Sequence, residues 1–579
     1  MKETNKQWDN DDTIVSPEDY GAKLHINTTF IVDPNLPVSL DLETDENGTF
    51  VGAAVCQDDK DVYYTTHLYN LKAVKECEFI MQGGKFDIRE LRSWGIDVNY
   101  DNLIYDTKVM AYCYNTTLPS YSLKKIEKGN RVGLIEQFLP HLKWPTYKEM
   151  VGVGKKKVTL DKQPTERVAR YCGMDALATF KLYQHLVSHM SEQQKKYFHE
   201  IEMPVYRLLA RMEDRGIKID KQHLSKVGED LLCRLTALER AFEKEGFNPR
   251  SPKQLLEYFN KQGLGLKSTN VATLNKHKDN GTVVKLLDYR KYKKIHSTYV
   301  APYLESDKER IHTNFTQSTI TGRLACSSPN LQNIPAPDPE LKRFTMDVGT
   351  MIRKAFIADE GCRLLALDYS QIELRLLAHF SQEPVLLDAF KNGIDVHQAT
   401  ADSIGVGDNR RLGKTLNFYV VYGGQAKKIA ELAGVSLGEA EEAYNNYWER
   451  LPKAANWIAM EKFKSRKNGG VTTMMGRFIP LPGLKSKDKW ERFHWERVAI
   501  NAIIQGSASE IIKLAMLEVY KAGFMPILSI HDEIVFNIGS DEDETMIYER
   551  LKSIMENVVK LSVPLEVKGE YGRDWSSAK

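Results

Sequence analysis

Residues 527–538, ILSIHDEIVFNI, place a histidine and two acids in the middle of an otherwise apolar segment. The flanking runs ILSI and IVFNI are typical of buried strands, so the pattern predicts a hairpin with His531, Asp532 and Glu533 at its tip. Burying an ionised carboxylate without a partner costs free energy, and two adjacent carboxylates cost more. The segment is therefore either a surface loop or part of a site that expects a cation.

A second acidic position lies within residues 363–380, RLLALDYSQIELRLLAHF. Residues 363–367 predict a buried strand and an amphipathic helix follows, so Asp368 lies at the junction, where we expect it to face the same cleft as Asp532. Two such acids from distant parts of the chain repel each other unless they bind cations. Mg²⁺ binds a few carboxylates together with substrate phosphates, and paired Mg²⁺ ions promote phosphoryl transfer.

Between these acids lies a candidate phosphate-binding helix, RRLGKTLNFYVVYGG, residues 410–424. Every fourth residue lies on one stripe, which begins cationic and ends aromatic: Arg410, Lys414, Phe418 and Tyr422. Such a stripe suits a nucleoside triphosphate, with the phosphates at the Arg/Lys end and the base or sugar against the rings. Taken alone, a chance alignment of charged and core positions explains the stripe equally well. Its place between the two acidic segments favours the binding site.

The N-terminal part carries a second acidic pattern. In VSLDLET, Asp41 and Glu43 lie on one face of a predicted strand, which resembles half of a divalent-metal site. Taken alone, this spacing is more typical of a solvated edge strand. Asp87 follows in GGKFDIREL, and Tyr171 and Asp175 share a helix face in YCGMDALATFKLY. The phenol would orient a water beside a bound ion, or it packs as an ordinary, partly buried tyrosine.

Length and composition narrow the class of protein. The chain has 579 residues, which suggests roughly four domains or subdomains. Its formal net charge is +2, so any basic surface for nucleic acid must be local. The seven cysteines show no CxxC pairing, which favours reduced thiols over a disulfide framework or a zinc site. Because no apolar run could span a bilayer and the N-terminus is unlike a signal peptide, we expect a soluble, cytoplasmic protein.

The order of sequence patterns predicts the organisation of the chain. From about residue 28 to 70 the runs TTFIV, PVSLDLET, FVGAAVC and DVYYTTHL read as strands, and helical patterns follow to about 190. This predicts an α/β domain. A Lys-rich helical segment covers residues 221–300, and from 311 onward strands alternate with amphipathic helices.

The segments DYSQIE, RRLGKTLNFYVVYG and HDE resemble motifs A, B and C of the family A DNA polymerases, the group of bacterial DNA polymerase I and several phage replicative polymerases. The likeness runs from about residue 36 to the C-terminus through further segments in the family's order, such as EMPVYRLLARMEDRGIKID, RIHTNFTQSTITGRLACSSPNLQNIP, GVTTMMGRFIPLP, ERVAINAIIQGSASEIIKLAM and VPLEVKGEYGRDW. It implies an α/β and α+β multidomain fold, with a DnaQ-like (RNase H-like) exonuclease domain over residues 1–190 and a right-hand polymerase domain over 191–579. The thumb would cover about 200–310, the palm about 311–395 and 490–579, and the fingers about 396–489.

The resemblance also implies residue roles in the polymerase domain. Asp368 and Asp532 would bind two Mg²⁺ ions with the help of the Tyr369 carbonyl, and Glu533 would be auxiliary. The nucleotide would be bound by Arg410, Lys414, Phe418, Tyr422, Gln371, Glu373 and His397. Among these, Lys414 would protonate the departing pyrophosphate and Glu373 would be the steric gate against ribose. Phe418 occupies the position that governs dideoxynucleotide use, so we expect poor acceptance of terminators.

The implied DNA contacts are polar. Primer and template would be contacted by Arg323, Asn330, Gln332, Arg497, Asn501, Gln505 and His531. Donors in the minor groove can test pair geometry without reading sequence. Lys291, Lys293 and Lys294 would grip phosphates, or they form an ordinary solvated basic face.

In the exonuclease domain, the resemblance implies a second two-Mg²⁺ site at Asp41, Glu43, Asp87 and Asp175, with Tyr171 orienting the attacking water and Mn²⁺ as an accepted substitute in both sites. Gly83 stands where the family commonly has Asn, which affects a supporting contact and not the metal ligands. Smaller departures are Tyr419, Ile503 and the pair Ser509–Glu510.

The function implied is DNA-templated synthesis from dNTPs on a primer–template, with 3′–5′ proofreading. We expect no 5′ nuclease segment before the exonuclease segment, and we expect a compact thumb. Both expectations favour phage-type replication by a monomer without membrane contact. Helicase, primase and single-strand-binding protein are the candidate partners. A catalytically dead DNA-binding relative and a single-subunit RNA polymerase are the alternatives. The complete set of carboxylates argues against the first. Glu373 and the exonuclease segment argue against the second.

Overall fold

The computed structural model describes residues 15–126, 131–154, 157–335, 347–407, 409–419 and 423–578. Its N-terminal domain contains a six-stranded sheet in the order β1-β4-β3-β2-β5-β6. The strands are β1 (Lys23–Ile26), β2 (Val38–Thr44), β3 (Phe50–Cys56), β4 (Asp61–Thr65), β5 (Phe79–Met81) and β6 (Leu103–Asp106). β3 pairs antiparallel with both β2 and β4. The other pairs are parallel: β1 with β4, β5 with β2, and β6 with β5.

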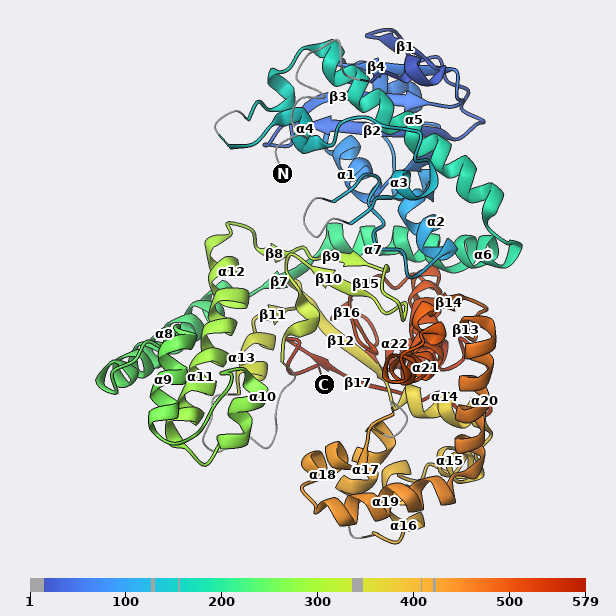
Figure 1. Cartoon of the computed structure of the whole chain (residues 1–579). Helices are drawn as coiled ribbons and strands as arrows, with labels where there is room; N and C mark the ends of the chain where they lie inside the picture. The colour runs from blue at the N-terminus through green and yellow to red at the C-terminus, as the bar shows by residue number, and fades with distance from the viewer. Residues whose placement is uncertain are drawn as a thin grey trace.

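Three of the four predicted N-terminal strands are confirmed, and one is wrong. PVSLDLET, FVGAAVC and DVYYTTHL contain β2, β3 and β4, but TTFIV forms no strand. The edge strand is instead KLHI, which ends at Ile26, just before Asn27 with its left-handed backbone (φ 53°). The helices of this domain are α1 (Lys85–Ser93), α2 (Thr107–Tyr114), α3 (Leu134–Phe138), α4 (Tyr147–Val151) and the long α5 (Thr165–His189), which packs on β2 and β3 (Figure 1).

The C-terminal part is built around a four-stranded antiparallel sheet, here called the central sheet. Its order is β15-β16-β12-β17, with β15 (Pro526–Ile530), β16 (Glu533–Gly539), β12 (Cys362–Tyr369) and β17 (Val567–Gly572). The predicted buried strand is confirmed, because Leu364, Leu365 and Leu367 of β12 are fully buried. The helices near this sheet are α13 (Val348–Arg353), α14 (Ile372–Ser381), α15 (Pro384–Lys391), α21 (Lys489–Lys521) and α22 (Glu544–Glu556).

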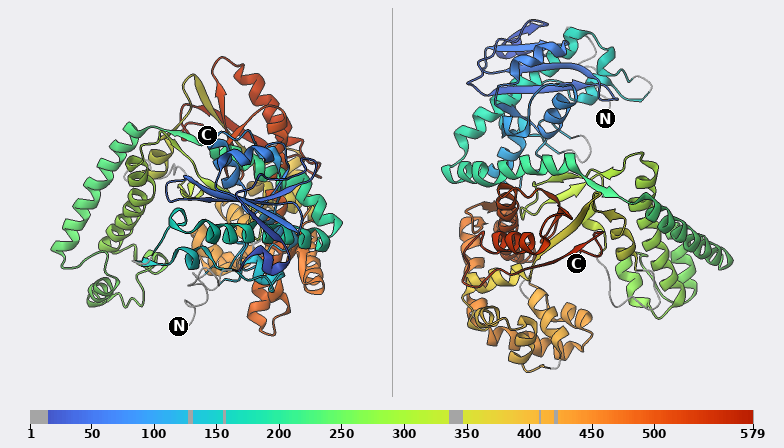
Figure 2. Two further views of the ribbon diagram at one scale, coloured as in Figure 1. Left: turned by 90° about the horizontal axis from the view of Figure 1, so that it is seen from above. Right: turned by 180° about the vertical axis from the view of Figure 1, so that it is seen from behind.

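Two helical regions lie on different sides of the central sheet (Figures 1 and 2). One comprises α8 (Lys221–Lys244), α9 (Pro252–Lys261), α10 (Val271–Leu274), α11 (Gly281–Ile295) and α12 (Ala301–Glu305). The other comprises α16 (Val396–Ser403), α17 (Arg410–Tyr419), α18 (Ala426–Ala433), α19 (Leu437–Arg450) and α20 (Pro452–Asn468). Three smaller sheets join β7 (Ile217–Ile219) with β8 (Arg310–Ile311) and β11 (Phe356–Ile357), β9 (Asn314–Thr316) with β10 (Ala325–Ser327), and β13 (Gly470–Thr472) with β14 (Phe478–Pro480).

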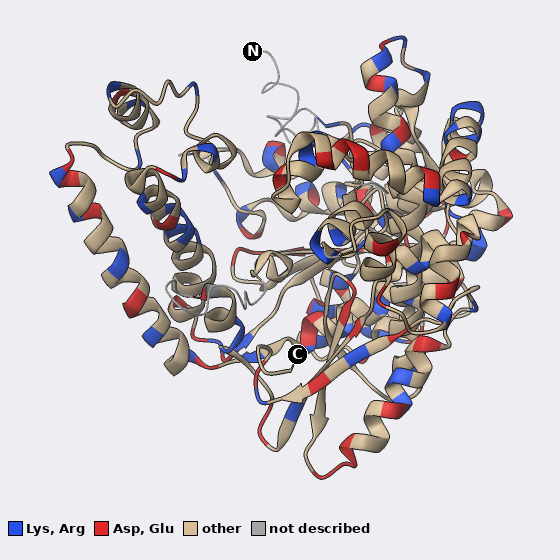
Figure 3. Ribbon diagram, turned by 90° about the horizontal axis from the view of Figure 1, so that it is seen from below, with Lys and Arg blue, Asp and Glu red and all other residues tan. Residues whose placement is uncertain are grey.

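Charges are interspersed over the surface. Figure 3 shows acidic and basic residues side by side along most elements, in keeping with a formal net charge of +2. Among the described residues, no helix combines the length and the apolarity that a membrane crossing requires.

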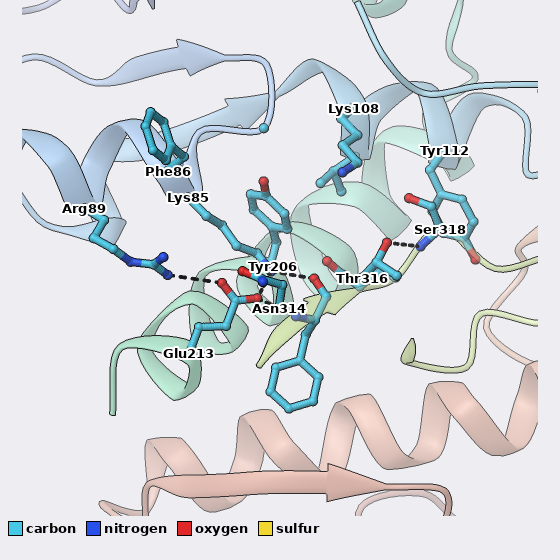
Figure 4. Close-up of a pocket in the computed structure, with 14 residues that line it drawn as sticks. Lys85, Phe86, Arg89, Lys108, Tyr112, Tyr206, Glu213, Asn314, Thr316 and Ser318 are labelled. Carbon is cyan, nitrogen blue, oxygen red and sulfur yellow. Dashed lines mark hydrogen bonds and ion pairs between the residues drawn. The ribbon is translucent and has the colours of Figure 1, made fainter. Parts of the chain in front are cut away.

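The two halves of the chain are joined by α6 (Glu192–Tyr197), a π-helical turn and α7 (Met203–Arg215). The boundary expected at residue 190 lies between α5 and α6. The N-terminal core nevertheless continues to Ala210, while the second core begins at Val205, so α7 serves both. Figure 4 shows Lys85 and Arg89 of α1 pointing to Glu213 of α7 beside a cavity of about 210 Å³. Lys85 Nζ lies 2.8 Å from Glu213 Oε1, and both side chains are buried.

Candidate functional site

The predicted acidic hairpin is present. Ile530 of β15 pairs with Glu533 of β16, which leaves only His531 and Asp532 in the turn. His531 has a left-handed backbone (φ 55°), a conformation that tight two-residue hairpin turns require. The tip is thus one residue shorter than predicted, because Glu533 already belongs to the strand.

The structure brings Asp368 and Asp532 together at one end of the central sheet. Asp368 lies opposite Glu533 in the β12–β16 register, and the Tyr369 N–H donates to the Asp532 carbonyl at 3.2 Å. Burial raises the pKa of Asp532, although Arg323 and His531 oppose the rise. Asp532 Oδ1 is buried without a hydrogen-bond partner among the described residues, and the nearest guanidinium nitrogen, Arg323 Nη2, is 3.9 Å away.

Glu533 faces the core behind the hairpin. Its Oε1 accepts a hydrogen bond from Trp575 Nε1 at 2.7 Å, and the residue is 4% exposed. The Arg353 guanidinium stacks on the same indole, 4.1 Å from its centroid. In this structure Glu533 therefore anchors the base of the hairpin, while its auxiliary part in catalysis stays a prediction.

A cavity of about 330 Å³ lies beside Asp532. The residues that line it include six that the sequence predicts to contact nucleotide or DNA: Arg323, Gln371, Glu373, Phe418, Gln505 and His531. Glu373 accepts a hydrogen bond from Arg323 Nη2 at 2.5 Å. Burial raises the pKa of Glu373 to about 7, with Arg323 opposing and Asp532 adding to the rise. Gln371, just before α14, is held in the left-handed region (φ 53°), and such local strain is common at functional sites.

On helix α17, the two basic side chains predicted to bind phosphates face solvent. Arg410 and Lys414 are exposed, and Arg410 Nη2 pairs with Asp395 at 2.7 Å. The helix packs closely on α16, since a Cβ at Gly413 would lie 2.3 Å from the His397 carbonyl oxygen. Tyr422, the last residue of the predicted stripe, lies outside the described residues.

His397 is buried between α16 and α17. Its Nδ1 lies 3.2 Å from Asn417 Nδ2, its Nε2 lies 3.4 Å from Gln371 Nε2, and its ring is 5.5 Å from that of Phe418. Burial lowers the pKa of His397 to about 4, because the charged imidazolium would lose its hydration. The imidazole is therefore neutral at physiological pH.

The predicted DNA-contacting residues fall into two groups. Arg323, Gln505 and His531 line the cavity, and Gln505 shares one face of α21 with Arg497 and Asn501. Asn330 and Gln332 instead bind the local backbone. Asn330 Oδ1 accepts from the Gln332 N–H at 3.1 Å, and Gln332 Nε2 donates to the Leu324 carbonyl at 2.7 Å.

The N-terminal acids also gather in one place. Ligand atoms of Asp41, Glu43 and Cys172 lie within 4.8 Å of one another. Burial and the nearby charge of Asp175 together raise the pKa of Glu43 to about 8, with Lys124 opposing the rise. Burial likewise raises the pKa of Asp41 well above its usual value, with Asp175, Glu43 and Asp87 adding repulsion. Asp87 and Asp175 are therefore close enough to Asp41 and Glu43 to disfavour the charged forms of these two acids.

Asp175 has partners that sequence reasoning missed. Lys124 Nζ lies 2.8 Å from its Oδ1, and Trp144 Nε1 donates to the same oxygen at 3.0 Å. Cys172 was also missed as a neighbour of the site, although its Sγ is 3.4 Å from Asp41 Oδ2. Gly83 adopts φ 79°, and its N–H donates to Asp106 Oδ2 at 2.9 Å.

Both acidic sites fit a divalent cation. Carboxylate oxygens are the ligands that Mg²⁺ prefers. At the central sheet, Asp532 keeps a buried oxygen to which no group in the described part of the chain donates a hydrogen bond. At the N-terminal site, mutual repulsion contributes to the raised pKa values of Asp41 and Glu43.

The chain belongs to DNA polymerase family A, because the family's sequence profile matches residues 221–577. The DNA polymerase I of Synechocystis sp. is 34% identical, over 94% of this chain and 60% of the relative. The thermostable DNA polymerase I of Thermus aquaticus is 36% identical, over 66% of this chain and 48% of the relative. The chain thus spans 60% and 48% of these two relatives.

A solved structure supports the same family. The POL domain of Pol1 from M. smegmatis, in complex with DNA primer-template and dNTP, is 26% identical with a TM-score of 0.79, over 94% of this chain and 96% of that one. The predicted family and its mixed α/β polymerase fold are confirmed.

Proposed function

We propose that the chain is a DNA-templated DNA polymerase that extends a primer 3′ end with dNTPs. The observation that carries the proposal is the meeting of Asp368 and Asp532 at one end of the central sheet, beside a cavity lined by polar residues. The bound state of the M. smegmatis neighbour, with DNA primer-template and dNTP, supports the substrate class.

The chain's own residues have distinct tasks in this proposal. Asp368, Asp532 and the Tyr369 carbonyl would hold divalent ions, generally Mg²⁺. Bound ions of this kind activate an attacking oxygen and stabilise a leaving one. Arg410 and Lys414, exposed on α17, bind the triphosphate, and Lys414 gives a proton to the departing pyrophosphate.

We also propose a 3′–5′ exonuclease in the N-terminal domain. Its metal-binding carboxylates would be Asp41, Glu43, Asp87 and Asp175, and Tyr171 would orient the attacking water. The clustering of these acids around one buried site supports the assignment. We further propose, from the sequence resemblance, phage-type replication with helicase, primase and single-strand-binding protein as partners. The relatives named above are bacterial enzymes and do not bear on this part of the proposal.

Primer extension tests the polymerase proposal directly. The purified chain with Mg²⁺ and a primed template is expected to extend the primer with dNTPs and to use rNTPs poorly. Absence of extension would favour a catalytically dead DNA-binding relative, and preferential use of rNTPs would favour an RNA polymerase.

Replacing both N-terminal acids, Asp41→Ala with Glu43→Ala, is expected to remove degradation of a single-stranded 3′ end. Loss of one electrostatic contributor in an active site typically costs a factor of about 10²–10³, and here two are lost. Extension by the same protein should stay near normal, because these residues lie in the other domain. Persistent 3′ degradation would contradict the assignment.

The substitution Glu373→Ala is expected to admit ribonucleotides. It removes a carboxylate that lines the cavity and is held in place by Arg323, so space opens where a 2′-OH would lie. The ratio of kcat/KM for dNTP over rNTP should fall at least about tenfold, since a contact of this kind is worth roughly 1–3 kcal/mol. An unchanged sugar preference would show that Glu373 is not the gate.

A further inference from the structure

A lysine ammonium is built into the N-terminal acid cluster. Lys124 Nζ lies 2.8 Å from Asp175 Oδ1 and 2.9 Å from Oδ2, and it donates to the Pro145 carbonyl at 3.2 Å. It also stands 4.1 Å from the ring centroid of Tyr171 and 5.0 Å from that of Trp144. The side chains of Lys124 and Asp175 are 14% and 7% exposed, so this ion pair is an interior feature.

Lys124 and Trp144 bind the carboxylate oxygens that Asp175 would offer to a metal. A carboxylate has about four lone-pair positions, and here Lys124 and Trp144 together use both oxygens. The positive charge also reaches the other acids, because Lys124 offsets part of the repulsion felt by Asp41 and Glu43. A cation on the chain thus performs part of the charge neutralisation that a divalent ion would perform.

We propose that Lys124 is a tethered counter-cation that holds Asp175 and competes with a divalent ion for it, so that Lys124 sets the metal affinity of the N-terminal site. The inference rests on the exonuclease function proposed above for the same carboxylates. A lysine suits this role, because its ammonium is a point charge on a flexible stem that can withdraw when a stronger cation arrives. Lys124 is a positioning residue for Asp175 and takes no part in bond breaking.

Mn²⁺ binding measures this competition without reference to activity. The experiment counts free Mn²⁺ by electron paramagnetic resonance in a protein carrying Asp368→Asn and Asp532→Asn, which removes the charges of the other site. In this background, Lys124→Met is expected to tighten the weakest N-terminal Mn²⁺ site on the order of tenfold to a hundredfold, because the unit charge that contacts Asp175 no longer opposes the ion.

Two further variants make the result specific. Lys125→Met removes the same charge from the adjacent, exposed position and is expected to leave Mn²⁺ affinity unchanged. Lys124→Gln removes the charge but keeps a hydrogen-bond donor. It should raise the Mn²⁺ affinity as Lys124→Met does, and it keeps the test valid if the apolar methionine disturbs folding.

The outcomes separate the two proposals. Asp41→Asn with Glu43→Gln in the same background should abolish the N-terminal Mn²⁺ site, and its persistence would overturn the metal site and the Lys124 inference together. If that double variant loses Mn²⁺ but neither Lys124 variant binds it more tightly than the background protein, the inference about Lys124 alone is wrong.

Discussion

Replacing Asp532 or Asp368 by asparagine is expected to lower kcat for primer extension at least about a hundredfold, since one lost electrostatic contributor already costs roughly 10²–10³. Asparagine keeps the shape of the side chain, so the hairpin and the β12–β16 pairing should persist. What disappears is one of the two negative charges that meet at the end of the central sheet. Single-turnover extension of a labelled primer with Mg²⁺ measures the effect.

The same strand supplies a control for this experiment. Asp541 is exposed just beyond Gly539, where β16 ends far from the hairpin tip, so Asp541→Asn removes an equal charge at the other end of the strand. Its extension rate should stay close to that of the parent protein. Near-normal extension by Asp532→Asn would contradict the assignment of the polymerase site.

The location of the acidic hairpin and of Asp368 could be predicted from the sequence because both depend on local periodicity. An apolar run on each side of a polar break fixes where strands begin and end, and side chains alternate along a strand. Which face of the sheet the Glu533 side chain lies on depends, in contrast, on the length of the turn. The structure closes the turn with two residues, so Glu533 occupies the first strand position and turns toward Trp575.

The partners of the N-terminal acids could not be predicted in this way. Lys124 and Trp144 lie 51 and 31 residues before Asp175, in segments without a regular pattern, and only the folded chain brings them to it. His397 shows a related limit. The resemblance implied that His397 binds the nucleotide, but its burial against α17 depends on the close approach at Gly413. Contacts between elements set these environments, and sequence periodicity describes single elements.

Removing the charge of Lys513 is expected to destabilise the junction between the two halves of the chain strongly. Lys513 of α21 and Glu202 of the π-helical turn before α7 are both fully buried, with Nζ and Oε1 2.6 Å apart. Glu202 also accepts from the Tyr197 hydroxyl at 2.8 Å and from Gln317 Nε2 at 2.5 Å. Lys513→Met leaves a buried carboxylate without its cation, a change that costs roughly 3–5 kcal/mol.

Hydrogen exchange of the α21 and α7 amides measures this loss locally, as a fall in their opening free energy. The control is Lys521→Met at the end of the same helix, where the partner Glu518 is half-exposed and only the small change typical of surface ion pairs is expected. Adding Glu202→Gln to Lys513→Met should recover much of the lost stability, because no buried charge then lacks a counter-ion. If Lys513→Met destabilised α21 no more than Lys521→Met does, the buried pair would not hold the junction together.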